Sequence, residues 1–60
     1  MRELTSYSLA AAAELARAEL EAAGIECRVA DFSAMQEMAD HRLMVDPTRV
    51  AEAALILGVD

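Results

Sequence analysis

The chain has 60 residues, of which 57% are hydrophobic, and a formal net charge of -6. This length allows one domain, over residues 1–60, and the core must be thin because many of the hydrophobic residues are alanines. All five basic residues are arginines, and they are scattered among 11 acidic residues. That pattern excludes the basic stripe with which proteins bind phosphates, so we expect no nucleic-acid partner.

Cysteine content and hydropathy exclude two further classes of protein. Cys27 is the only cysteine, which excludes an internal disulfide framework and a zinc site made of several thiolates. No apolar run has the length of a signal peptide or approaches the ~18 residues of a membrane span. We therefore expect a cytoplasmic protein with no membrane partner.

The first half of the chain predicts a strand followed by a long helix. Residues 2–7 include β-prone side chains and precede a change to a helical period, which indicates a short strand. Ser8 is the expected N-cap of a helix that runs to Ala23, and Gly24 follows in the position that permits a positive φ. The predicted buried side of this helix consists of Leu9, Ala12, Ala13, Ala16, Leu20 and Ala23.

Two more strands are predicted from alternation of apolar and polar residues. The first covers 25–29, where the apolar positions are Ile25, Cys27 and Val29. The second covers 41–46, with Leu43 and Val45 on its buried face. The connector 32–40 breaks the alternation, and its capping-box pattern leaves a helical turn and a loop as alternatives.

A second helix is predicted to follow the pair Asp46-Pro47. Asp46 is the expected N-cap, and Pro47 fits the first helical position, where its missing N–H costs nothing. Gly58 is expected to end the helix. The predicted buried side consists of Val50, Ala51, Ala54 and Leu57.

This order of elements predicts an α+β, ferredoxin-like (PII/ACT-like) βαββα fold. A right-handed crossover places the first and third strands side by side, the second at an edge, and both helices on one face of a three-stranded sheet. The first strand then has an unpaired edge, and the core is small, so both arguments favour a homodimer. A three-helix bundle is the alternative fold, because the strands are short and Ala, Glu and Met are abundant.

Three runs of sequence resemble a known family. They are Ala-Glu-Leu-Ala-Arg-Ala-Glu-Leu-Glu-Ala-Ala-Gly-Ile at 13–25, Arg-Leu-Met-Val-Asp-Pro at 42–47 and Ala-Glu-Ala-Ala at 51–54. The chain resembles small prokaryotic signal-transducing proteins of unknown function, which are likened to the nitrogen-regulatory PII fold. The resemblance implies a ferredoxin-like fold and a regulatory role in signal transduction, without catalytic residues. The connector is too short for the nucleotide-binding loop of PII proteins, so nucleotide binding is not carried over.

Residues that commonly carry chemistry are few. His41 and the carboxylates of Asp31 and Asp40 form a conceivable metal cluster, but they are more simply polar residues of a connector. A nucleophilic pair of Cys27 with His41 is disfavoured because Cys27 has the phase of a core position. Both glycines end helices, so no phosphate-binding loop exists. We therefore predict no enzyme activity, no metal and no cofactor.

Two candidate partner surfaces remain. One is the connector, whose apolar Phe32, Met35 and Met38 either fold over the core or form an adaptable contact patch. The other is the outer face of the sheet, predicted to carry Glu3, Thr5, Glu26, Arg28, Arg42 and Met44. The predicted partner surface is therefore Phe32, Met35, Met38, Arg42 and Met44. The expected function is a regulatory module that binds a small ligand or a protein partner; an adaptor that uses a sheet edge or the connector is the alternative, and a metal protein or enzyme centred on His41 is a weaker one.

Overall fold

The computed structural model describes residues 1–33 and 39–59. Along the chain, the elements are strand β1 (Arg2–Tyr7), helix α1 (Ala10–Ala22), strands β2 (Cys27–Ser33) and β3 (Ala39–Val45), a 3₁₀ turn (Pro47–Arg49) and helix α2 (Val50–Leu57). The protein is therefore α+β, with three strands and two helices in the described part, and the alternative of a three-helix bundle is wrong.

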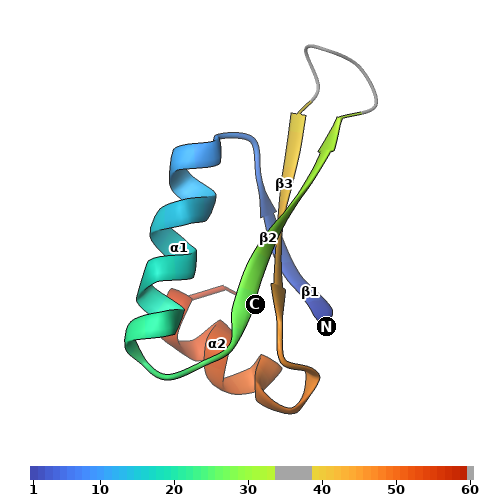
Figure 1. Ribbon diagram of the computed structural model, residues 1–60. Coiled ribbons are helices and arrows are strands. Elements are labelled where there is room, and N and C mark those ends of the chain that lie inside the picture. Colours follow the sequence, from blue (N-terminus) through green and yellow to red (C-terminus); the bar gives the residue numbers. More distant parts are fainter. Residues whose placement is uncertain (34–38, 60) are drawn as a thin grey trace.

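The sheet has the strand order β1-β3-β2, and both neighbouring pairs are antiparallel. Leu43 and Val45 of the central strand are completely buried in a cluster that includes residues of both helices. Because side chains alternate along a strand, both helices cover the face that carries Leu43 and Val45. Figure 1 shows α1 running beside the sheet and the shorter α2 near its lower end.

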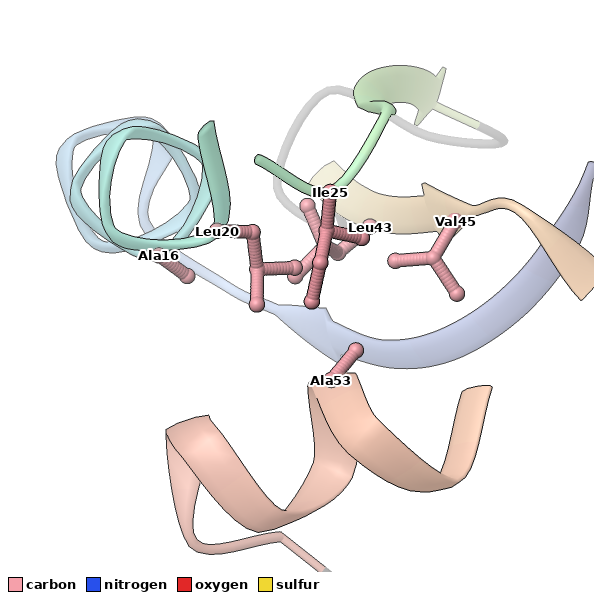
Figure 2. Close-up of a cluster of buried hydrophobic side chains, with 6 residues drawn as sticks. All are labelled: Ala16, Leu20, Ile25, Leu43, Val45 and Ala53. Carbon is pink, nitrogen blue, oxygen red and sulfur yellow. The ribbon is translucent and has the colours of Figure 1, made fainter. Parts of the chain in front are cut away.

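The core is small, as the alanine content predicts. In the part of the chain that the structure describes, the fully buried large side chains are Leu20, Ile25, Leu43 and Val45. Figure 2 shows these four together with Ala16 from α1 and Ala53 from α2, which bring the helix backbones close to the cluster. A domain with so few large buried side chains has little hydrophobic stabilisation to offset chain entropy.

The N-cap of helix α1 lies one residue later than predicted, and the helix begins at Ala10. Leu9, not Ser8, is the N-cap residue, and it makes no side-chain capping hydrogen bond. Leu9 is extended (φ -114°) and 67% exposed, so its prediction as a buried helical residue is wrong. Ala23 is also exposed, at the C-cap. Gly24 has φ 79°, as its predicted role at the helix end requires.

The hairpin of β2 and β3 extends into the predicted connector. Phe32 pairs with Asp40, and Ser33 pairs with Ala39, so both ends of the segment 32–40 belong to strands. The remaining connector residues, 34–38, lie outside the described residues. At the other end, β2 begins at Cys27, and Ile25 is buried just before the strand.

The 3₁₀ turn before helix α2 begins with the predicted cap from Asp46, whose side chain accepts a hydrogen bond from the Thr48 backbone N–H. The first turn is 3₁₀, and the α-helix follows from Val50. Val50 and Leu57 of the predicted buried side pack against the core, and Ala54 is partly buried. Ala51 is exposed, so its prediction as buried is wrong, and Ala53 is the fully buried residue of the helix. Gly58 ends the helix with φ 71°, as predicted.

Strand β1 contains a bulge that the sequence did not predict. Glu3 pairs with Met44, but the next position on β3, Leu43, pairs with Thr5, so Leu4 is an extra residue. Thr5 consequently shares the helix-covered face with its partner Leu43. The prediction that placed Thr5 on the outer face is therefore wrong.

Candidate interaction surfaces

One face of the sheet carries no helix among the described residues. Arg42 and Met44 alternate with the buried Leu43 and Val45, so they lie on the face opposite the helices. The residues that pair with Arg42 and Met44 on the two outer strands lie on the same face. Asp40 also lies there, because it is two positions before Arg42 on β3. We call this surface the open face; it consists of Glu3, Ser6, Arg28, Ala30, Asp40, Arg42 and Met44.

Charges on the open face balance each other. The Nε atom of Arg42 lies 2.9 Å from Oδ2 of Asp40 and 3.6 Å from Oε1 of Glu3. The hydrogen bond that the guanidinium donates to Asp40 raises the pKa of Arg42. Arg28 is exposed and forms no ion pair with the described residues. The seven residues of the open face include two acidic and two basic side chains and carry no net charge, although the chain carries a net charge of -6. The predicted Glu26 precedes β2 and is not among them.

The structure brings together part of the predicted partner surface. Arg42 and Met44 share the open face, and both are partly buried in the chain itself. Phe32 lies in β2 opposite Asp40, so its backbone belongs to the sheet and not to a connector. Met35 and Met38 lie outside the described residues.

Asp31 and His41 are direct partners across β2 and β3. Nδ1 of His41 lies 2.6 Å from Oδ1 of Asp31, and the His41 side chain is only 16% exposed. Asp40 does not join them, because its carboxylate binds Arg42 on the opposite face. The part of the chain that the structure describes contains no group of three potential metal ligands. The predicted cluster is thus a cross-strand pair, which stabilises the hairpin.

Cys27 and His41 lie far apart in the hairpin. Cys27 pairs with Val45, four positions along β3 from His41, a separation of about 13 Å at the usual rise per residue. The Cys27 thiol packs against the core and lies 3.5 Å from the carbonyl oxygen of Arg17. Burial raises the pKa of the Cys27 thiol, which makes it a poorer nucleophile at neutral pH.

The sequence reasoning missed a shallow hollow between α1, the end of β1 and the end of α2. Its volume is about 240 Å³, and its lining residues are Tyr7, Ala12, Leu15, Ala16, Glu19 and Leu57. Leu15 remains 64% exposed there. The signal that points to this hollow is Leu15 itself, a large apolar residue outside the predicted buried side of the helix.

The two edges of the described sheet carry features that discourage pairing with another strand. The bulge at Leu4 interrupts the regular geometry of β1, and bulges twist an edge strand away from further partners. Strand β2 presents exposed charges at Arg28 and Asp31. Charged side chains on edge strands have the same protective effect. These edges are therefore poorer docking sites than the open face.

None of the helices in the described residues is both long enough and apolar enough to cross a membrane.

Comparison with known proteins gives no relatives: no protein-family model, no curated protein and no solved structure matches the chain. The resemblance to PII-like signal-transducing proteins consequently stays a prediction based on three runs of sequence.

Proposed function

We propose that this chain is a small cytoplasmic module of regulation or signal transduction, which acts by binding and forms a homodimer. The observation that carries the proposal is the open face, a surface of three strands with both helices on the other side. A sheet covered on one face only has a flat surface available for a partner. The resemblance to signal-transducing proteins supports a regulatory role.

A ferredoxin-like arrangement belongs to the same proposal. The element order strand, helix, strand, strand, helix supports it, as does the central position of β3 between β1 and β2. Because both helices lie on one face of the sheet, the open face is the surface of the sheet left for a partner.

The small core favours self-association. Among the described residues, four large side chains are fully buried, whereas the equally large Leu15 remains 64% exposed. A domain near the lower size limit of independent folding gains stability when a second copy covers more of its surface.

A protein partner fits the surfaces better than a small ligand does. The hollow of about 240 Å³ lies below the roughly 300 Å³ at which pockets for small molecules begin. It is also open and lined mainly by alanine and leucine, with Glu19 as its charged residue. A sensor that binds a small ligand between two subunits is the second candidate, because two copies would enlarge the enclosed space.

Sedimentation velocity over a concentration series, extended into the millimolar range, tests the proposal. A dimer that forms with increasing concentration is expected, together with a thermal midpoint that rises with concentration. Thermal-shift measurements with nucleotides, amino acids and 2-oxo acids then separate the two candidates, since a ligand that binds the folded state raises the midpoint. A monomer throughout the series would overturn the homodimer.

A further inference from the structure

The open face has a charge pattern that is complementary to itself. One row across the sheet consists of Glu3 on β1, Met44 on β3 and Arg28 on β2. The row is therefore acidic at one edge, apolar in the centre and basic at the other edge. Because adjacent strands lie about 4.8 Å apart, Glu3 and Arg28 are separated by roughly 10 Å and do not pair within one chain.

We propose that two copies of the chain stack their open faces about a twofold axis parallel to β3. This arrangement places Met44 against Met44 of the second copy and Glu3 against Arg28 of the second copy, twice in each dimer. The inference rests on the proposed function, since it names the surface that the homodimer uses.

The direction of the axis follows from the charges. Rotation about an axis parallel to β3 exchanges β1 with β2 and preserves position along the strands, so Glu3 meets Arg28. Rotation about an axis across the strands leaves β1 facing β1 and exchanges neighbouring rows, so that Met44 meets Arg42 and Glu3 meets Ser6. Of these two arrangements, the first joins opposite charges on both outer strands and leaves an apolar contact of Met44 with Met44 at the centre.

The second row of the open face is compatible with this stacking. Ser6 and Ala30 are small, which allows the two sheets to approach to the usual spacing of about 10 Å. Arg42 would face Arg42 of the second copy, and by the same rotation Asp40 would face Asp40. Each guanidinium already has carboxylates within 4 Å in its own chain, from Asp40 at 2.9 Å and Glu3 at 3.6 Å, so their repulsion is offset.

The helical side of the molecule is less suited to a second copy. Helix α1 carries Glu14, Glu19 and Glu21 against Arg17 alone. Two helical layers that met would bring these carboxylates together, and like charges across an interface are unfavourable. The neutral open face avoids this repulsion.

The size of the open face predicts a weak dimer. Three strands of about six residues, at ~3.3 Å per residue and ~4.8 Å between strands, give a patch of roughly 300 Å². Stable interfaces bury about 800 Å² on each partner. We therefore expect dissociation on dilution, which makes the association easy to measure by sedimentation.

Exchange of charges between two variants gives the sharpest test. Glu3→Lys makes both facing positions basic, and Arg28→Glu makes both acidic, so each variant alone is expected to raise the dimer dissociation constant about tenfold or more. An equimolar mixture can form a dimer of one chain of each variant. In it, the lysine at position 3 of the first chain faces the glutamate at position 28 of the second, and Glu3 of the second chain faces Arg28 of the first. A mixed dimer of near wild-type affinity is therefore expected. Leu55→Lys, at a residue 84% exposed on α2, is the control and should dimerise like the wild type.

The outcomes separate this inference from the proposed function. A wild-type dimer that neither charge variant weakens overturns the stacked open faces and leaves the homodimer intact. Weakening by both variants without recovery in the mixture overturns the contact between Glu3 and Arg28. A wild-type chain that stays monomeric overturns both proposals. If Glu3→Lys fails to fold by circular dichroism, Met44→Arg replaces it, because two arginines on the axis should abolish the dimer; unchanged dimerisation would contradict the inference.

Discussion

Arg49 donates a hydrogen bond from Nη1 to the carbonyl oxygen of Gly24, at 2.9 Å, although the two residues are 25 positions apart. The same guanidinium forms a two-pronged pair with Glu52, with Nε to Oε1 and Nη2 to Oε2 both at 3.0 Å. Arg49 thus connects the start of α2 to the turn between α1 and β2. This contact holds the second helix against the rest of the fold.

Replacement of Arg49 by Ala should lower the free energy of unfolding by about 1 kcal/mol, the usual net value of a hydrogen bond with a partly exposed charged donor. Arg49→Lys keeps the charge but cannot make the planar, two-pronged contact, so it should recover only part of the loss. Urea denaturation followed by circular dichroism measures both. Arg2→Ala, at an exposed end of β1, is the control. Equal effects of Arg49→Ala and Arg2→Ala would contradict the role of Arg49.

Leu20 should be among the positions least tolerant of truncation. It is fully buried in α1 and contacts the cluster from the sheet and α2. Leu20→Ala is expected to cost about 3 kcal/mol, a large part of the stability of so small a domain. Leu15→Ala in the same helix, where the side chain is 64% exposed, should cost well below 1 kcal/mol. Similar midpoints in urea for the two variants would contradict the assignment of the core.

Local signals explain the parts of the fold that were predicted correctly. The positive φ of Gly24, the cap from Asp46 and the buried pair Leu43 and Val45 each depend on residues close in sequence. Glycine permits the backbone conformation, aspartate accepts the N–H of the first turn, and alternation places two apolar residues on one face. These effects operate without knowledge of the tertiary structure.

The incorrect predictions concern features of the fold that tertiary contacts determine. Cross-strand pairing extends β2 and β3 through Phe32 and Asp40, and no local pattern reports a partner eight positions away. The sequence placed Val50 and Leu57 on the buried face of α2 correctly, but it could not tell which of Ala51 and Ala53 is buried, because identical residues give no periodic signal. The bulge that turns Thr5 toward the helices depends on register with β3. Consequently the sequence indicated Glu3, Arg28, Arg42 and Met44 of the open face, but on β1 it placed Thr5 there instead of Ser6.

Gly24 should be sensitive to substitution for a reason unrelated to packing. Its φ is 79°, and a Cβ built there would have no atom within 4 Å, so the cost of Gly24→Ala is confined to the left-handed backbone conformation. About 1 kcal/mol of destabilisation is expected, and Gly24→Asn should lose less because asparagine tolerates this region. Thermal melting of the two variants against the wild type checks the order. If alanine proved as stable as glycine, the turn would not have this conformation in solution.

Asp46 should make the stability of the protein depend on pH in the acid range. Its Oδ1 accepts hydrogen bonds from the Thr48 backbone N–H at 3.0 Å and from Thr48 Oγ1 at 2.8 Å. These bonds favour the ionised carboxylate and lower the pKa of Asp46 below its ordinary value of 3.8. The unfolded chain then binds more protons at this group than the folded chain does as pH falls through that value. The stabilisation is therefore complete above pH 3.8 and is lost as the pH falls further, through the lowered pKa of the folded state.

Asp46→Asn removes the charge but keeps an acceptor, so it tests this dependence directly. At neutral pH the variant should melt a few degrees below the wild type, as expected for a weakened helix cap in a domain of this size. Below pH 3.8 the two melting temperatures should converge, because protonation gives the wild-type side chain the same neutral character as the amide. Glu19→Gln changes the net charge equally at an exposed position of α1 and serves as the control. A difference between wild type and Asp46→Asn that stayed constant down to the lowest pH would show that the charge of Asp46 does not stabilise the start of α2.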